Sequence, residues 1–171
     1  MRTRAKRMSA EFLPPLPATI EDVDINGPWA ETWKGHNFLS HIDNAWGIVV
    51  FTTNRMTEAL QRCDTMFIDG TFRTAPSPYL QFVTIPHGLF HGHVIPLVFA
   101  LLTNKTVGLY RQLFSHLKRY TRRVTGRCLR PANIVLDFEQ AILLAVETEL
   151  PGTRLSGTSK KQTVVTFPCS I

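Results

Sequence analysis

The chain has 171 residues, a formal net charge of +6 and a pI near 9.6, and hydrophobic residues make up 44% of it. This apolar content is enough for a packed core, and the length fits one domain with or without a tail. The positive charge favours an acidic partner, with nucleic acid foremost; a basic soluble protein without such a partner is the alternative.

Cysteine usage and hydropathy argue against a disulfide-rich secreted protein and against a membrane protein. Cys63, Cys128 and Cys169 are odd in number and widely spaced, so they match neither a disulfide framework nor a zinc pair. The first residues are basic, polar and proline-containing, unlike a secretory leader. The longest apolar run, 94–102, is too short for a bilayer and contains Pro96. We therefore expect a soluble, intracellular protein that is not secreted and has no membrane partner.

The first part of the chain reads as an accessory segment. Residues 1–20 carry several basic residues and prolines, which predicts a disordered arm that could contact phosphates or serve as a nuclear address. The lead-in up to residue 45 has mixed polarity. We interpret Trp29, Trp33 and Trp46 as packing residues, since such aromatics more often close over a core than stack on bases.

The next stretch predicts a strand, a short helix and a second strand. The segment WGIVVFT at 46–52 is typical of a strand, and Asn54 is expected to cap a helix that runs to about Cys63. An apolar run at 65–68 then leads into Asp69, with Gly70 directly after the acid. We expect a core strand that presents Asp69 at the edge of a sheet, because an unpaired charge inside a core is costly.

A hairpin and a long helix follow. Residues 79–86 and 93–102 predict two strands joined through 87–92, and Pro96 suggests an edge position for the second because proline cannot donate to a sheet. Thr106 is a good N-cap for the helix. One face of this helix is apolar at i, i+3, i+4 and i+7, with Tyr110, Leu113, Phe114 and Leu117.

The opposite face of the same helix is basic. Arg111, Lys118 and Arg122 share it, Arg119 and Arg123 lie beside them, and no acid within the helix answers them. Such a face is usually only solvated. The density of uncompensated charge nevertheless makes contacts with the phosphates of DNA a second interpretation.

The last elements repeat the pattern of an apolar run that ends in an acid. Residues 132–137 predict a strand that ends at Asp137, 138–150 a helix stopped by a Pro-Gly pair, and Arg154 the start of another strand. Between Asp69 and Asp137 the chain has no Asp or Glu. Two carboxylates at the ends of two strands suit a divalent cation, although each could instead serve only as a turn former or a helix cap.

The order of three hairpin-connected strands, helix, strand and helix is the layout of an α/β, ribonuclease H-like mixed sheet, incomplete at its C-terminal end. In that layout the first and fourth strands lie side by side, so Asp69 and Asp137 converge. Residues 46–157 also resemble the catalytic domain of Mutator-like element (MULE) transposases. The resemblance rests on MFIDGTFRTAP at 66–76, GHVIPLVFALLTNKT at 92–106 with Tyr110 after it, and IVLDFEQA at 134–141.

The resemblance implies DNA strand cleavage and transfer with two Mg²⁺ ions as cofactors. Asp69 and Asp137 correspond to the first two acids of the family's catalytic triad, and they would hold the metal. Arg111, Lys118 and Arg122 would contact the DNA backbone. The family also implies a nuclear protein that acts on DNA and has no small-molecule substrate.

The sequence departs from the family after Gly157. The family continues with Gly-Cys-x-x-His and a later glutamate, whereas residues 158–171 form an unrelated tail and no acid follows Glu149. Glu139 is a poorer third acid because it should have turned into the helix. We therefore expect 1–45 to be an arm and lead-in, 46–157 a C-terminally truncated transposase domain, and its catalysis weak or absent. The alternatives are a domesticated module that binds DNA or a full-length transposase without cutting, or a relic without function.

Overall fold

The computed structural model describes residues 17–71, 75–90, 93–136 and 139–157. The strands are β1 Leu39–Asp43, β2 Ile48–Phe51, β3 Thr65–Thr71, β4 Gln81–Phe90, β5 His93–Leu102, β6 Asn133–Leu136 and β7 Arg154–Gly157. The helices are α1 Asn54–Gln61, α2 Val107–Thr125 and α3 Gln140–Glu149, with a 3₁₀ turn at Gly27–Trp29. No helix within these ranges is long and apolar enough to cross a bilayer.

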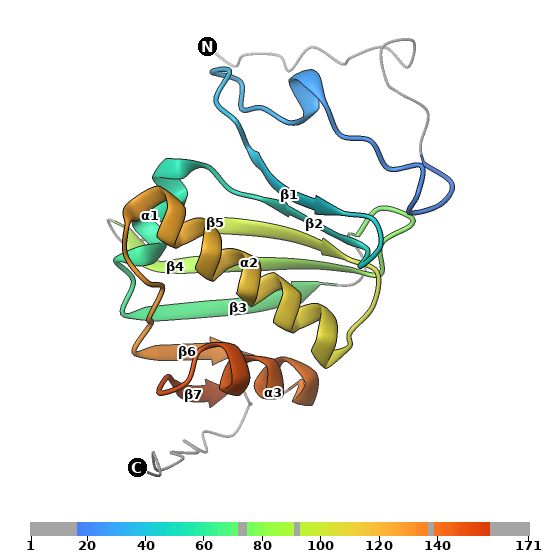
Figure 1. The fold of residues 1–171 in the computed structure, drawn as a ribbon. Helices are drawn as coiled ribbons and strands as arrows, with labels where there is room; N and C mark the ends of the chain where they lie inside the picture. Colours follow the sequence, from blue (N-terminus) through green and yellow to red (C-terminus); the bar gives the residue numbers. More distant parts are fainter. Residues whose placement is uncertain (1–16, 72–74, 91–92, 137–138, 158–171) are drawn as a thin grey trace.

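The strands in the described ranges form one mixed sheet in the order β1-β2-β5-β4-β3-β6-β7 (Figure 1). From β1 through β2, β5 and β4 to β3, each strand is antiparallel to the next. Strands β6 and β7 then continue the sheet parallel to β3. The predicted α/β class with a mixed sheet is confirmed. So is the predicted neighbourhood of the first and fourth core strands, since β3 pairs directly with β6.

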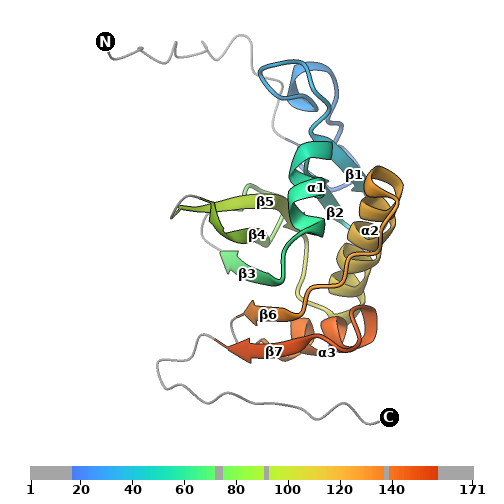
Figure 2. The ribbon, with the colours of Figure 1, turned by 90° about the vertical axis from the view of Figure 1, so that its left-hand side faces the viewer.

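Helices α1, α2 and α3 lie on the same face of the sheet (Figure 2). Helix α2 begins where predicted: the Thr106 hydroxyl oxygen accepts a hydrogen bond from the Leu109 N–H, and Gly126 ends the helix at a φ of 70°. The apolar face of α2 is buried against the sheet in one core, which also receives Ile142 and Val146 of α3. This packing fixes the orientation of α2 on the sheet and therefore which of its faces is exposed.

The opposite face of the sheet is covered in part by the lead-in. Val23, Val49 and Tyr79 form a second buried cluster there, with half-buried side chains such as Ile25 packed against it. The segment from residue 17 to 45 also contributes β1, an element that the sequence did not predict. Much of the lead-in is therefore part of the folded domain.

Two expectations about the helix cap and the tryptophans are wrong. Thr53, not Asn54, caps α1, because its hydroxyl oxygen accepts from the Met56 N–H at 3.2 Å. The tryptophans do not close over the core: Trp33 is 90% exposed, and Trp29 and Trp46 are each 46% exposed. Trp46 does lie against Gly108 of α2, so one edge of its ring is covered.

Pro96 does not place β5 at the edge of the sheet. Strand β5 lies between β4 and β2, but β2 pairs only with residues from Phe99 to Leu102. Pro96 is therefore beyond the reach of β2, where the missing N–H interrupts no ladder. On its other side it pairs with Pro86 next to a β-bulge. The local rule for proline holds, while the expectation for the whole strand is wrong.

Candidate active site at the end of β3

Asp69 lies near the C-terminal end of β3 with its side chain exposed. The alternation of the strand explains this placement, because Met66 and Ile68 point into the core beneath the helices and Phe67 and Asp69 point the other way. The carboxylate is therefore on the face of the sheet opposite α2. At this position the carboxylate remains hydrated, so it does not incur the free-energy cost of desolvation.

The neighbouring strand β6 ends one residue before the second predicted acid. In the parallel pairing of β3 and β6, Ile68 lies opposite Leu136, the last residue of β6. Asp69 directly follows the first of these and Asp137 the second. Asp137 itself lies outside the described residues, so the convergence of the two carboxylates stays a prediction. Within the described ranges, no group of three or more His, Cys, Asp or Glu side chains could hold a metal ion.

Behind Asp69, on the helix face of the sheet, lies a buried polar network. Gly70 leaves room for the amide of Gln81 on β4, since a Cβ at position 70 would collide with Gln81 Nε2. The Tyr110 hydroxyl of α2 donates to Gln81 Oε1 at 2.6 Å, and Glu139 Oε1 lies 3.2 Å from the same hydroxyl. The network thus joins β3, β4, α2 and the N-cap residue of α3 beside the candidate acidic site.

Burial determines the protonation of this network. Gln81 and Tyr110 are fully buried. Burial raises the pKa of Tyr110 far above its ordinary value, and the nearby Glu139 carboxylate raises it further. The hydroxyl therefore stays protonated and available as a donor. No hydrogen-bond partner for Gln81 Nε2 is present among the described residues.

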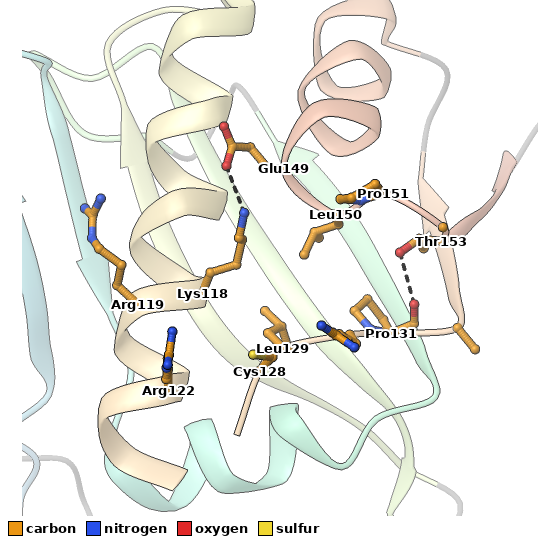
Figure 3. Close-up of a pocket in the computed structure, with 13 residues that line it drawn as sticks. Lys118, Arg119, Arg122, Cys128, Leu129, Pro131, Glu149, Leu150, Pro151 and Thr153 are labelled. Atoms are coloured by element: carbon orange, nitrogen blue, oxygen red, sulfur yellow. Dashed lines mark hydrogen bonds and ion pairs between the residues drawn. The ribbon is translucent and has the colours of Figure 1, made fainter. Parts of the chain in front are cut away.

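The basic face of α2 is less free than the sequence suggested. Glu149 of α3 accepts from Arg111 Nε at 3.1 Å and from Lys118 Nζ at 3.2 Å. Its side chain is 13% exposed. Burial acts to raise the pKa of Glu149, but the two hydrogen bonds and the adjacent charges outweigh it and hold the pKa below its ordinary value. Figure 3 shows the Lys118–Glu149 pair.

Arg122, the third predicted DNA contact, differs from the other two. Its side chain is exposed, and no ion pair joins it to an acid within the described ranges. The expectation that no acid answers the basic face holds within α2 itself. In the folded domain, α3 packs Glu149 against two of the three cations. Sequence separation hid this contact.

A comparison with protein families agrees with this arrangement. The family described as the MULE transposase domain matches residues 65–157. This span begins at the first residue of β3 and ends at the last residue of β7, so it contains Asp69, the buried network and the basic helix. The match covers more than half of the chain, and the chain belongs to this family. No curated protein matches it.

The sequence did not reveal Gln81, Tyr110 or Glu149 as parts of these networks. Helical periodicity places Tyr110 only on an apolar face, yet a buried tyrosine hydroxyl needs a partner. Gln81 shares the buried face of β4 with Val83 and Ile85, which was the available signal for that partner. For Glu149 the sequence contains no comparable signal, because its partners come from a helix that precedes it by more than 30 residues.

Proposed function

We propose that this domain serves DNA transposition as the ribonuclease H-like core of a MULE-type transposase. The order β5-β4-β3-β6-β7, with three antiparallel strands and then two parallel ones, supports the ribonuclease H-like assignment. The observation that carries the function is the direct parallel pairing of β3 with β6. Parallel neighbouring strands end on the same side of a sheet, which supports the proposal that Asp69 and Asp137 share one metal site.

Asp69 and Asp137 are proposed as ligands of Mg²⁺. Asp69 fits this role because it is exposed, carries hard carboxylate oxygens and lies beside a rigid buried network. When bound there, a divalent cation would activate a water or a DNA 3′-hydroxyl for attack at a phosphodiester bond. The chain's own contribution is placement. The Tyr110–Gln81 hydrogen bond holds β4 to α2, and Gly70 lets β3 lie close to the Gln81 side chain.

DNA contacts are proposed for Arg111, Lys118 and Arg122, with the backbone phosphates as ligands and nuclear DNA as the target. Of these, Arg122 is free of acids among the described residues and should contribute most. A domesticated module that binds DNA or a full-length transposase without cutting is the second candidate function. The exposed cations at the end of α2 favour it.

We propose that cleavage by this chain is weak or absent. Asp69 and Asp137 are the two proposed ligands, and two carboxylates supply few ligands for two cations. Members of a catalytic set act as a unit, so an incomplete set loses most of the rate. Mg²⁺ binding can persist, because a cation relieves the repulsion between two nearby carboxylates.

The test combines Mn²⁺ binding with nicking of supercoiled DNA. The parent chain should bind Mn²⁺ weakly, as titrated by electron paramagnetic resonance, and should not nick DNA. Asp69→Asn and Asp137→Asn should each abolish the binding. Asp64→Asn is the matched control, since Asp64 is exposed and precedes β3 at its opposite end. Binding that survives both site substitutions refutes the metal site, and nicking that both eliminate refutes the claim of inactivity.

A further inference from the structure

We propose that a pocket at the end of α2 binds DNA phosphates and is separate from the acidic end of β3. The pocket has a volume of about 630 Å³ and lies between the last turns of α2, the segment before β6 and the turn between α3 and β7 (Figure 3). Its charged and reactive lining consists of Lys118, Arg119, Arg122, Cys128, Arg130 and Glu149.

The floor of the pocket is fixed by packing and by hydrogen bonds. Leu129 and Leu150 are buried in the main core, one from each side of the pocket. The Thr153 hydroxyl donates to the Pro131 carbonyl oxygen at 3.0 Å, which joins the segment before β6 to the turn before β7 (Figure 3). The Arg154 N–H donates to the Ala132 carbonyl oxygen at 2.9 Å beside it. A ligand would therefore meet a preformed surface.

The charge of the lining selects an anion. Four cations line the pocket against one acid, Glu149, and that acid is already shared between Lys118 and Arg111. The side chains of Arg119, Arg122 and Arg130 are exposed and have no ion pair with an acid in the described ranges. Guanidinium groups bind phosphate oxygens through paired N–H donors, so a phosphodiester is the ligand class that fits.

A purely structural role explains only part of this arrangement. Arg122 and Arg123 lie in the last turn of α2, where cations interact favourably with the helix dipole. That effect falls off within one turn, so it gives no reason for Arg130 beyond the helix or for Arg119 a turn earlier. It also gives no reason for the pocket. Binding of an anion accounts for Arg122 and Arg130 together, whereas Arg119 also donates to the Ser115 hydroxyl at 3.0 Å on its own helix.

The pocket and Asp69 lie at opposite ends of the paired strands β3 and β6. Pro131 and Ala132 line the pocket and directly precede β6, whereas Asp69 lies level with the far end of that strand. The four residues of β6 span ~13 Å at the usual rise per residue. Asp69 also faces away from α2. One phosphate cannot occupy both places, so the pocket would hold a DNA segment other than the one at Asp69.

The proposal takes DNA as the ligand from the proposed function, and it is independent of the acidic site. Cys128 makes it directly testable because this exposed thiol lines the pocket. Cys63 is buried, and burial raises the pKa of its thiol to about 12, so it should not react. In a Cys169→Ser background, a maleimide should therefore report Cys128 alone.

The experiment measures alkylation of Cys128 and DNA affinity in the full chain. A 20-base-pair duplex should protect Cys128 from the maleimide. Changing Arg119, Arg122 and Arg130 together to Gln should remove the protection and reduce the slope of log affinity against log salt by ~2.7, at ~0.9 per phosphate contact. Lys34→Gln, an exposed cation in the lead-in, is the control for charge and should change neither. Circular dichroism checks that the triple variant is folded.

The outcomes separate this proposal from the acidic site. Duplex DNA that binds without protecting Cys128, or an unchanged salt slope in the triple variant, overturns the pocket. Protection by an RNA duplex but not by DNA overturns the choice of ligand. Asp69→Asn should leave the protection intact, and the triple variant should keep Mn²⁺ binding. If the parent chain does not bind Mn²⁺ but DNA still protects Cys128, the metal site at Asp69 is refuted and the proposal for the pocket is not.

Discussion

At the residue scale, the close approach of Gly70 to Gln81 restricts what can stand beside Asp69. A Cβ at position 70 would collide with the Gln81 amide, which is buried and already bonded to Tyr110. Gly70→Ala should therefore destabilise the domain by about 1–3 kcal/mol, as overpacking of a rigid site does. Urea denaturation measures this.

Gly108, which lies in α2, provides a control for which the expected change in stability is opposite. A Cβ at Gly108 would approach only the Trp46 ring, at 3.5 Å, which is an ordinary van der Waals distance. Gly108→Ala should stabilise the domain by about 0.5–1 kcal/mol, because glycine is unfavourable in a helix. Equal effects of both substitutions would mean that Gln81 moves aside and that the close approach at Gly70 has no structural role.

The Tyr110 hydroxyl is the second restriction at this scale. It has one hydrogen and two neighbouring acceptors, Gln81 Oε1 and Glu139 Oε1. Tyr110→Phe leaves buried polar atoms unsatisfied and should cost about 1–3 kcal/mol in the same denaturation experiment. Tyr120→Phe removes a hydroxyl that bonds the exposed Asn54 side chain and should cost less. An equal loss in both variants would contradict a special role for the network.

At the element scale, β1 is joined to α2 through two histidines. The rings of His41 and His116 stack with centroids 4.4 Å apart, and His116 Nε2 lies 3.2 Å from the Ser40 hydroxyl. Burial lowers the pKa of His116 to about 3, with His41, Arg119 and Arg123 as further causes. Burial also lowers the pKa of His41, while Asp43 opposes the shift. Both rings are thus held neutral in the folded state.

This arrangement predicts acid sensitivity. Because the pKa of His116 is lower in the folded state than the ordinary 6.5, the unfolded state binds more protons between these values. The contribution of neutral His116 to the free energy of unfolding is therefore fully present above pH 6.5. It falls as the pH decreases towards 3, by up to roughly 1.4 kcal/mol per pH unit. Denaturation at pH 7.5 and 5.0 tests this. His116→Gln should lose most of the pH dependence, and an unchanged profile in that variant would assign the effect to other groups.

At the scale of the whole molecule, the strand and helix pattern was largely predictable from the sequence. The apolar runs, the Thr106 cap and the Pro-Gly stop gave β3, β5, α2 and α3 close to their observed bounds, since these signals are local. Strand β1 escaped prediction because its residues are only half-buried and its partners come from β2. The ion pairs of Glu149 and the pocket depend on tertiary packing, which local pattern does not encode.

The distribution of charge leads to the last prediction. Glu149 neutralises part of a surface that otherwise carries only cations, and it holds Arg111 and Lys118 away from a ligand. Glu149→Gln should free both cations and strengthen DNA binding, with the salt slope steeper by ~0.9 for each additional phosphate that the protein neutralises. Glu147→Gln makes the same change in net charge at an exposed position without an ion pair to a described residue. Fluorescence anisotropy with a labelled duplex compares the two. A larger gain in DNA affinity from Glu149→Gln would show that DNA contacts this face of α2. Equal gains from the two variants would mean that only the net charge of the protein matters.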